Sequence, residues 1–486
     1  MHGVPAAGAT ALSDAEAFAC FEAACALQSE GDLLAARAAF ETLLRAAPTG
    51  HAVCAPCWAN VGMVIEDLGE REAARLAYEQ AVALDAQLFA PRLHLGHWWM
   101  QDAHPEAPAL AERWLQSAAQ LQPQAPTTWS ALGGLLSCLR RDADAEACLR
   151  HALALAPDHQ AARFNLAYLT LRQGRWAEGW ACLESRPAPQ ELAQRLPWPR
   201  WAGEPLAGRR LLIVNDAGHG DLIHFWRYTP WVAARGAGQI AWMVQAPLIP
   251  LLQAQVDVGP LYALDERIPV SGPEAPEVWA PLLSLPWLCG QEPLPGEGAW
   301  PAELPYLRCP DSAEATGAID AADDAAARPA ERPLTIGLVW HGNPKHENDA
   351  ERSLPDVGAL APLWTALAGR ELHFVNLQPE GDAVLAPLLA GPLLRDFAEV
   401  ARTLTGLDLL ITVDTAYAHL AGALGCPVWV MLPHWKTDWR WLDERSDSPW
   451  YPGVMRLFRQ RSRGDWAGVM ADVAQALVAW CPRGSR

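Results

Sequence analysis

The chain has no run of apolar residues that approaches the length of a membrane span, which is about 18 residues or more. Its N-terminal sequence, MHGVPAAGATALSDAEAF, also has neither the basic stretch nor the leucine-rich stretch of a secretory signal. These two absences predict a protein that has no membrane span and is cytoplasmic.

Positive charge is scarce, and lysine is almost missing. The 37 lysine and arginine residues face 56 acidic residues, so the formal net charge is −19, and Lys345 and Lys436 are the two lysines of the chain. A field of this sign repels phosphate backbones. We therefore expect no nucleic acid among the partners.

The 11 cysteines form no regular framework, and their number is odd. This pattern argues against a disulfide scaffold and is typical of reduced thiols in a cytosolic protein. Cys54 and Cys57 stand at metal-ligand spacing, but no second pair follows at the distance of a zinc ribbon. The sequence predicts no metal site.

Apolar residues, by contrast, are plentiful. Hydrophobic residues make up 51% of the 486 positions and charged residues 19%, which is enough apolar material for packed cores and argues against a disordered chain. At about 100–200 residues per domain, this length predicts roughly three domains.

A periodic pattern fills the first third of the chain. Large apolar anchors recur at spacings of 38, 37, 34 and 34 residues, and a small residue stands four positions before each anchor. Small residues let two antiparallel helices approach closely, and the anchor fills the groove between them. Gly62 and Gly133 are further small residues, and a proline after three of the anchors ends the second helix of the pair. The anchors are Phe40, Tyr78, Leu115, Leu149 and Leu183.

This pattern resembles the tetratricopeptide repeat, with roughly five units over residues 15–186. The resemblance implies an all-α solenoid domain at 1–186 that offers a concave surface to an extended peptide or a protein partner. The alternative is that the array only scaffolds the rest of the chain, or joins copies of it into a homo-oligomer.

Behind a connector at 187–207 that is rich in proline and tryptophan, short apolar runs alternate with helical stretches, which is typical of βαβ units. We predict an α/β half at 208–310, an Ala/Asp-rich linker at 311–333 and a second α/β half at 334–482. Ligands of open α/β sheets lie outside the carboxyl ends of the strands, so the loops there are the candidate site. The expected strands are Leu211–Val214, Ile240–Val244, Leu261–Leu264, Ile336–Trp340, Phe374–Leu377, Leu409–Val413 and Val428–Leu432.

The loop after the first strand carries Gly218, His219, Gly220 and Asp221 in front of a predicted helix. The two glycines permit a tight turn and a close approach of the backbone. Asp221 is a candidate general base, but aspartate is also among the best residues for capping a helix N-terminus. His219 and the nearby His224 compete with Asp221 for the role of base.

The loop after Ile336–Trp340 is strongly polar and carries Asn343, Lys345 and Arg352. A diphosphate needs cationic donors, so this loop is a candidate diphosphate site. The alternative is a charged loop that is merely solvated.

Two further loops complete the candidate site. Asp414 and Thr415 end a strand and lead into a helix of small residues, whose N-terminus suits an anion. His419, on that helix, either contacts the ligand or makes an inward hydrogen bond. After the next strand, Trp439 and Arg440 belong to an aromatic segment that is able to stack on a base or a sugar.

Together these segments resemble bacterial tetratricopeptide-repeat glycosyltransferases of the heptosyltransferase group. A repeat array before a catalytic unit is also remotely similar to the O-GlcNAc transferases. The segments are VNDAGHGDLIHFWRY, GLVWHGNPKHENDAERSLP, FVNLQ, LDLLITVDTAYAHLAGALGCPVWVMLP, DWRW and DSPWYPGVMRLFRQ.

The resemblance implies a GT-B fold, meaning two Rossmann-like halves with a cleft between them, in which the C-terminal half holds a nucleotide sugar and transfer is inverting and metal-independent. It puts the family's Gly-Asp on Gly220 and Asp221, and its phosphate-holding Asp-Thr on Asp414 and Thr415. It also puts Gln378, in FVNLQ, in the donor site. Relatives usually carry Glu-Gln where this chain has Asp216-Ala217.

We therefore expect a glycosyltransferase with a nucleotide-sugar donor, no cofactor and an acceptor protein recruited by the repeats. The departing nucleoside diphosphate would be stabilised by Lys345, Arg352 and the helix after Thr415. The chain has one Asp-x-Asp, at Asp142–Asp144 inside the repeats, so the metal-binding motif of the other glycosyltransferase fold is missing from the α/β part. The alternative is a repeat adaptor whose α/β halves are inactive.

Overall fold

A computed structural model describes residues 12–48, 50–256, 258–289, 304–310, 333–366, 372–378 and 391–480. The chain forms two compact units with the break after Leu166. We refer to them as the repeat unit and, from Ala167 on, the α/β unit. The predicted linker at 311–333 lies outside the described residues except for Pro333.

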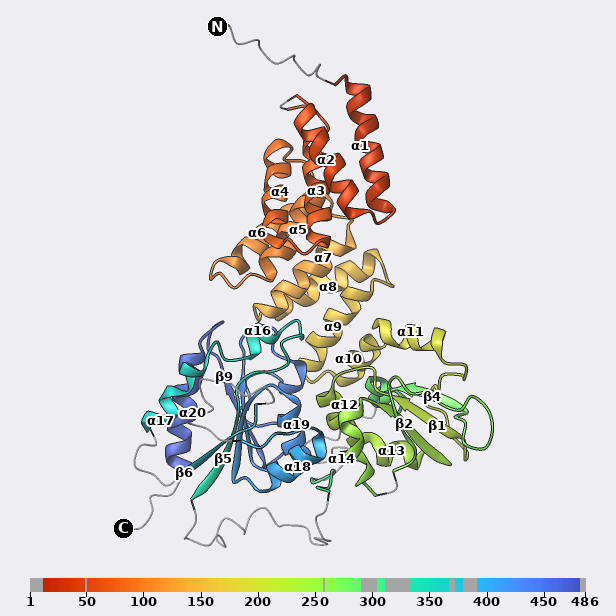
Figure 1. The fold of residues 1–486 in the computed structure, drawn as a ribbon, viewed down its shortest axis with the longest axis vertical. Helices are drawn as coiled ribbons and strands as arrows, with labels where there is room; N and C mark the ends of the chain where they lie inside the picture. The colour runs from red at the N-terminus through yellow and green to blue at the C-terminus, as the bar shows by residue number, and fades with distance from the viewer. Residues whose placement is uncertain are drawn as a thin grey trace, which may run out of the picture. The chain divides into compact units, whose positions relative to one another are not determined.

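The repeat unit consists of helices that pack in consecutive pairs, α1 with α2, α3 with α4, α5 with α6 and α7 with α8 (Figure 1). Helix α9 begins in this unit and crosses the break, and α10 follows it. The predicted helical repeat array is confirmed. The bounds are α1 (Asp14–Ser29), α2 (Leu33–Ala46), α3 (Cys54–Asp67), α4 (Arg71–Leu84), α5 (Ala90–Met100), α6 (Ala107–Leu121), α7 (Pro126–Cys138), α8 (Asp142–Leu155), α9 (Gln160–Arg172) and α10 (Trp176–Leu183).

The packing of each pair follows the predicted division between small residues and anchors. A Cβ atom at Gly62 would lie 2.4 Å from Cε1 of Tyr78, and one at Gly133 would lie 2.6 Å from Cγ of Leu149. Only glycine therefore lets the two helices come this close. Both anchors are fully buried, with no exposed surface.

The first sheet of the α/β unit has the strand order β3-β2-β1-β4, and all its pairings are parallel. Its strands are β1 (Arg210–Val214), β2 (Gln239–Val244), β3 (Leu261–Ala263) and β4 (Val278–Pro281). Strand β4 was not among the predicted strands. Leu211 pairs with Ile240 of β2 on one side and with Val278 of β4 on the other, so chain order reverses beside β1.

The second sheet has the order β6-β5-β7-β8-β9 and is also parallel throughout. Its strands are β5 (Leu334–Val339), β6 (Leu372–Asn376), β7 (Leu409–Val413), β8 (Val428–Leu432) and β9 (Met455–Arg459), of which β9 was not predicted. Chain order reverses between β5 and β7. The α/β region with parallel sheets is thus confirmed.

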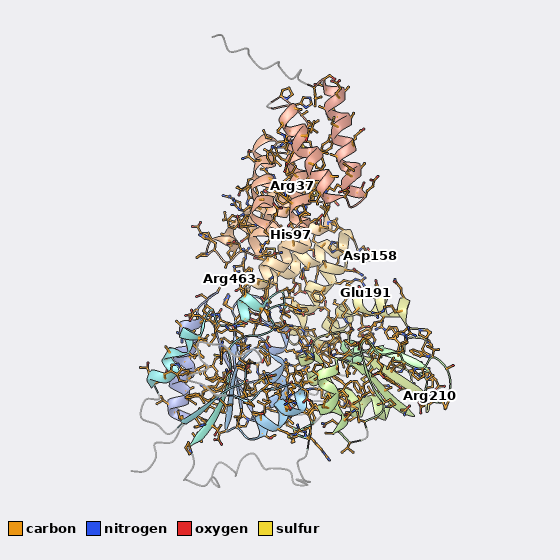
Figure 2. All side chains as sticks on the ribbon, in the orientation of Figure 1. Arg37, His97, Asp158, Glu191, Arg210 and Arg463 are labelled. Atoms are coloured by element: carbon orange, nitrogen blue, oxygen red, sulfur yellow. The ribbon has the colours of Figure 1, made fainter. Side chains whose placement is uncertain are left out.

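Helices cover both sheets, and the side chains between the layers fill the interior (Figure 2). Helix α12 follows β1, helix α19 follows β7, and the two pack against each other between the sheets (Figure 1). One apolar core runs from the first sheet through these helices to the second. The helices are α11 (Pro187–Arg195), which lies inside the predicted connector, α12 (His219–Phe225), η1 (Trp226–Tyr228), α13 (Thr229–Ala234), η2 (Ala246–Leu248), α14 (Ile249–Gln253), η3 (Leu282–Ser284), α15 (Leu285–Leu288), α16 (Asp349–Arg352), η5 (Val357–Leu360), α17 (Ala361–Ala366), α18 (Phe397–Thr405), α19 (Ala416–Ala423), η6 (Trp439–Trp441) and α20 (Trp466–Trp480).

Candidate functional site

The loop after β1 turns directly into α12, with Gly218 at the N-cap position. The backbone N–H of Gly218 donates to Oδ2 of Asp221 at 2.8 Å, so this carboxylate closes the first turn of the helix. Asp221 therefore does stabilise the helix N-terminus, although from inside the first turn and not from the cap position. Its side chain remains 26% exposed, which leaves the carboxylate accessible.

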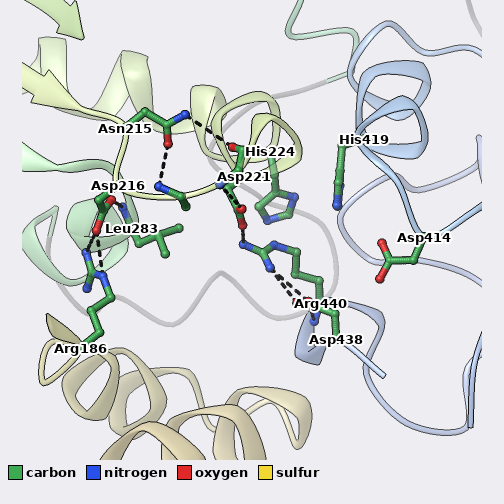
Figure 3. Close-up of polar contacts among 12 residues, drawn as sticks. Arg186, Asn215, Asp216, Asp221, His224, Leu283, Asp414, His419, Asp438 and Arg440 are labelled. Carbon is green, nitrogen blue, oxygen red and sulfur yellow. Dashed lines mark hydrogen bonds and ion pairs between the residues drawn. The ribbon is translucent and has the colours of Figure 1, made fainter. Parts of the chain in front are cut away.

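The other oxygen of Asp221, Oδ1, accepts a hydrogen bond from Nη2 of Arg440 (Figure 3). Nη1 of Arg440 donates to both carboxylate oxygens of Asp438, at 3.1 Å each. The guanidinium group is 7% exposed and lies over the ring of Trp439, 4.4 Å from its centroid. The structure thus brings the predicted base and a predicted donor-binding residue into one ion pair, which joins α12 to η6.

Gly220 sets how closely α12 approaches α19. A Cβ atom there would lie 3.0 Å from Cδ2 of His419 and 3.3 Å from Cα of Ala416. The N-terminal turns of the two helices are therefore in direct contact. His219, beside Gly220, packs against the ring of Phe397 at a centroid distance of 5.1 Å, and burial lowers its pKa, which keeps its imidazole neutral near pH 7.

Asp414 lies directly after β7, with its side chain on the same side of α19 as His419 (Figure 3). Nε1 of Trp441 donates to Oδ2 of Asp414 at 2.9 Å. Burial, together with the negative charge of Asp438, raises the pKa of Asp414 to about 6. A carboxyl group with such a pKa changes charge close to neutral pH, which is a property of functional sites.

Thr415 is the N-cap residue of α19, and its Oγ1 lies 3.0 Å from Oγ1 of Thr412. The Thr415 side chain makes no capping hydrogen bond to the first N–H groups of this helix. Uncapped N–H groups and the positive end of the helix dipole favour an anion at this position.

The loop after β5 is held at its start by Gln378. Its Oε1 accepts from the backbone N–H of His341 at 3.1 Å, and its Nε2 donates to the carbonyl oxygen of His341 at 3.2 Å. Gln378 therefore shapes the loop through both ends of its amide. Asn343 is likewise used within the loop, where its Oδ1 accepts from the backbone N–H of Lys345 at 3.0 Å.

The two cations of this loop differ in their surroundings. Lys345 is exposed, and its ammonium group forms no hydrogen bond or ion pair with the described residues. Arg352 is 15% exposed and pairs with Asp349 at 3.3 Å. Its charge also acts on Asp414, whose pKa it lowers against the effect of burial. Arg352 is thus electrostatically part of the site.

Trp439 does not offer a ring to a ligand in this structure, contrary to what the sequence predicts for its loop. It is 2% exposed and packs edge-on against Trp180 and Trp450, at centroid distances of 5.1 and 5.8 Å. Trp441 and Trp435 of the same segment are also buried, at 0% and 2% exposure. The segment is aromatic because it belongs to the core.

Asp216 has a role that sequence reasoning missed. Its side chain is 1% exposed, and its Oδ2 accepts from Nε and Nη2 of Arg186, at 2.9 and 2.7 Å (Figure 3). Its Oδ1 accepts from the backbone N–H of Leu283 at 3.1 Å. This residue ties the end of the repeat helices to the loops after β1 and β4. The only hint in the sequence was that this chain has Asp216-Ala217 where relatives usually carry Glu-Gln.

Tyr451 and its neighbours are a second feature to which the sequence analysis assigned no role, although Tyr451 lies in the segment DSPWYPGVMRLFRQ. The Tyr451 hydroxyl lies 3.1 Å from Nδ1 of His224 and 2.9 Å from Nδ1 of His419. His224 is completely buried, so it is unable to act on a substrate as a base. His419 does make the inward hydrogen bond that its sequence position allowed.

Over residues 12–480 as far as they are described, no group of three or more His, Cys, Asp or Glu side chains is arranged to hold a metal ion. In the same residues, no helix combines the length and the apolar character that crossing a membrane requires.

Comparison with known proteins identifies one repeat directly. The tetratricopeptide repeat family matches residues 55–88, which contain most of α3 and all of α4. The chain is 26% identical over 433 residues to protein FlbA of Caulobacter vibrioides, which covers 75% of this chain and 69% of FlbA.

Solved structures that are similar to part of this chain include two tetratricopeptide-repeat proteins. A thermophilic tetratricopeptide-repeat protein of Thermus thermophilus is 24% identical, with a TM-score of 0.31 over 37% of this chain and 96% of that one. YrrB, a tetratricopeptide-repeat protein with an unusual peptide-binding site, is 18% identical, with a TM-score of 0.30 over 36% of this chain and 91% of its own.

Proposed function

We propose that the α/β unit transfers a sugar from a nucleotide-sugar donor to an acceptor, and that the repeats recruit a protein as that acceptor. The observation that carries the proposal is the contact between the N-terminal turns of α12 and α19, where Gly220 meets Ala416 and His419. Ligands of doubly wound sheets bind beyond the carboxyl ends of the strands, where chain order reverses. Here the helix N-termini at two such strand ends are in contact, which supports our proposal of a GT-B arrangement.

The second sheet is the more suitable side for the donor. The start of α19 offers backbone N–H groups that the Thr415 side chain does not cap, and Arg352 supplies a partly buried positive charge. Lys345 adds an ammonium group that nothing described in the chain neutralises. These groups would stabilise the charge that develops on the leaving nucleoside diphosphate, so the reaction needs no metal ion.

The first sheet is the more suitable side for the acceptor. An ionised carboxylate has about four lone-pair sites, and Asp221 uses one for Gly218 and one for Arg440. Asp221 therefore retains sites for the proton of an acceptor hydroxyl, while the two bonds fix its orientation. A general base that a further group holds in place is the usual arrangement. His219, with its neutral imidazole, is the second candidate for this role.

The repeats are typical of domains that bind protein segments. The repeats supply no side chain to the proposed sugar transfer. We therefore assign them to the recruitment of a protein acceptor.

The proposal is tested by incubating the purified full-length chain with a panel of nucleotide sugars and following the release of nucleoside diphosphate. We expect release with at least one donor, and faster release when a cell lysate supplies acceptors. Native mass spectrometry of the same samples identifies the nucleotide that stays bound. If no donor binds and none is consumed, the α/β unit is not a glycosyltransferase and the chain is a repeat adaptor.

A further inference from the structure

The cluster of His224, His419 and Tyr451 has a hydrogen-bonding arrangement that restricts how its protons are distributed. A tyrosine hydroxyl carries one proton, yet Tyr451 lies within hydrogen-bond distance of Nδ1 of both histidines. One histidine accepts that proton, and the other must therefore donate its own Nδ1–H to the tyrosine oxygen. The two imidazoles are opposite tautomers.

This argument requires both imidazoles to be neutral. Burial lowers the pKa of His224 and of His419 well below its usual value, and the charges of Arg227 and Arg440 lower both further. The cluster therefore holds neutral rings with one N–H each.

The surroundings of His224 decide which of the two histidines donates to Tyr451 and which accepts from it. Nε2 of His224 is fully buried, and none of the residues that the structure describes is a hydrogen-bond partner for it. Unpaired buried N–H groups are rarer than unpaired acceptors, and the two nearby guanidinium charges favour a lone pair over an N–H at this nitrogen. His224 therefore carries its proton on Nδ1 and donates to Tyr451, and Tyr451 donates to Nδ1 of His419. His419 is left with its proton on Nε2.

Tyr306 does not change the direction of the hydrogen bonds from His224 through Tyr451 to His419. Its hydroxyl lies 3.1 Å from the carbonyl oxygen of Ile223 and 3.4 Å from the Tyr451 hydroxyl, and it accepts from Nη2 of Arg227 at 3.0 Å. At 3.4 Å the Tyr306 oxygen is a poorer acceptor for the Tyr451 proton than Nδ1 of His419 at 2.9 Å, so that proton goes to a histidine.

The outer edge of His419 faces the proposed site. Its Cδ2, the atom bonded to Nε2, lies beside Gly220 at the meeting point of α12 and α19. The ring is held parallel to the indole of Trp441, at a centroid distance of 5.1 Å and an angle of 13°. Among the described residues, none forms a hydrogen bond with Nε2 of His419.

We propose that Tyr451 and His224 are positioning residues that hold His419 as the Nε2–H tautomer, so that His419 donates a hydrogen bond to the diphosphate of the donor. This inference rests on the proposed function for the ligand and on the hydrogen bonds alone for the tautomers. The opposite tautomer would present a lone pair to the phosphate oxygens and repel them.

The tautomers are measured directly in the full-length chain by long-range ¹H–¹⁵N correlation NMR with ¹⁵N-labelled histidine, with His224→Gln and His419→Gln used to assign signals. We expect a protonated Nε2 on His419 and a protonated Nδ1 on His224. The inference is overturned if His419 has a bare Nε2. The tautomers are read from the parent chain without a ligand, and the two variants serve only to assign its signals.

The ligand part is measured by calorimetry with inorganic pyrophosphate. Tyr451→Phe should weaken binding about tenfold, since a misoriented donor to a charged group is lost. Tyr306→Phe makes the same chemical change in the same cluster and should bind as the parent does. Equal affinity of Tyr451→Phe and the parent, with both folded, contradicts the role of Tyr451. If the parent binds neither pyrophosphate nor any nucleotide sugar, the proposed function fails together with the ligand part, and the tautomers are judged by NMR alone.

Discussion

The loops that follow β1 and β5 occupy equivalent places in the two sheets, but they use their polar residues differently. After β1, Asn215 bonds to Gln245 and Asp216 to Arg186, and both side chains are nearly inaccessible. After β5, residues 343–347 are exposed, and the Lys345 ammonium forms no hydrogen bond or ion pair in the described structure. Polar residues in the first loop mainly build the fold, whereas the second loop, in which Asn343 bonds to the backbone of Lys345, leaves the Lys345 ammonium group available to a ligand.

The strongest way to test the structural half of this comparison is Asp216→Ala. Arg186 is 5% exposed, and without Asp216 it would keep one carboxylate partner, Glu184, whose Oε1 lies 3.2 Å from Nη1. Removing one partner of a buried pair costs up to about 3–5 kcal/mol when the remaining charge has no other partner, so with Glu184 still present we expect the urea midpoint of the α/β unit to fall by part of that amount. The control is Asp447→Ala, whose partner Arg445 is 44% exposed, and it should cost less than about 1 kcal/mol. Equal effects of both variants would mean that Asp216 does not anchor the loop.

The ligand-binding half of the comparison is tested with Arg352→Ala and Lys345→Ala. Each variant removes a charged contact to the donor, which should weaken nucleotide-sugar binding by about 1.5–3 kcal/mol in calorimetry. Arg461→Ala removes an exposed arginine that pairs with Asp472, and it should leave the affinity unchanged. Parent-like affinity in both loop variants would show that the loop is only solvated.

A smaller effect is expected from Asp414→Asn, and it depends on pH. Burial raises the pKa of this carboxyl group from its usual 3.8 to about 6, so folding disfavours its ionised form. This cost is fully present above pH 6 and disappears as the pH falls towards 4. Asparagine keeps an oxygen for Trp441, so the variant should be about 1–2 kcal/mol more stable at pH 7.5.

Urea unfolding of Asp414→Asn and the parent at pH 7.5 and pH 4 provides the measurement. The difference in unfolding free energy should vanish at pH 4. A difference that is constant across this range would show that the effect of the substitution is not electrostatic.

The periodic and alternating parts of the fold were predictable from the sequence because local patterns determine them. Strands β7 and β8 have the predicted bounds, and the repeat anchors are buried as expected. Strand β4, with the sequence VWAP, is short and ends in proline, so it lacks a recognisable strand pattern. Strand β9 carries arginines at both the second and the last position, which hide its apolar alternation.

The candidate site was predictable only in outline. The loops after the strands were found because parallel sheets always present them at one edge. Which side chains bond within the protein depends on partners far away in the sequence, such as Arg440 for Asp221 and Arg186 for Asp216. The burial of Trp439 has the same origin, because its neighbour Trp180 comes from α10.

The most direct test of the assignment is the turnover of Asp221→Asn, compared with that of Asp438→Asn. Both carboxylates bind the guanidinium of Arg440, and asparagine can still accept the N–H of Gly218. If Asp221 is the base, Asp221→Asn should release nucleoside diphosphate about 10²–10⁴-fold more slowly at a nearly unchanged melting temperature, while Asp438→Asn stays within a few-fold of the parent. Full turnover in Asp221→Asn would contradict the assignment and leave His219 as the acceptor of the proton.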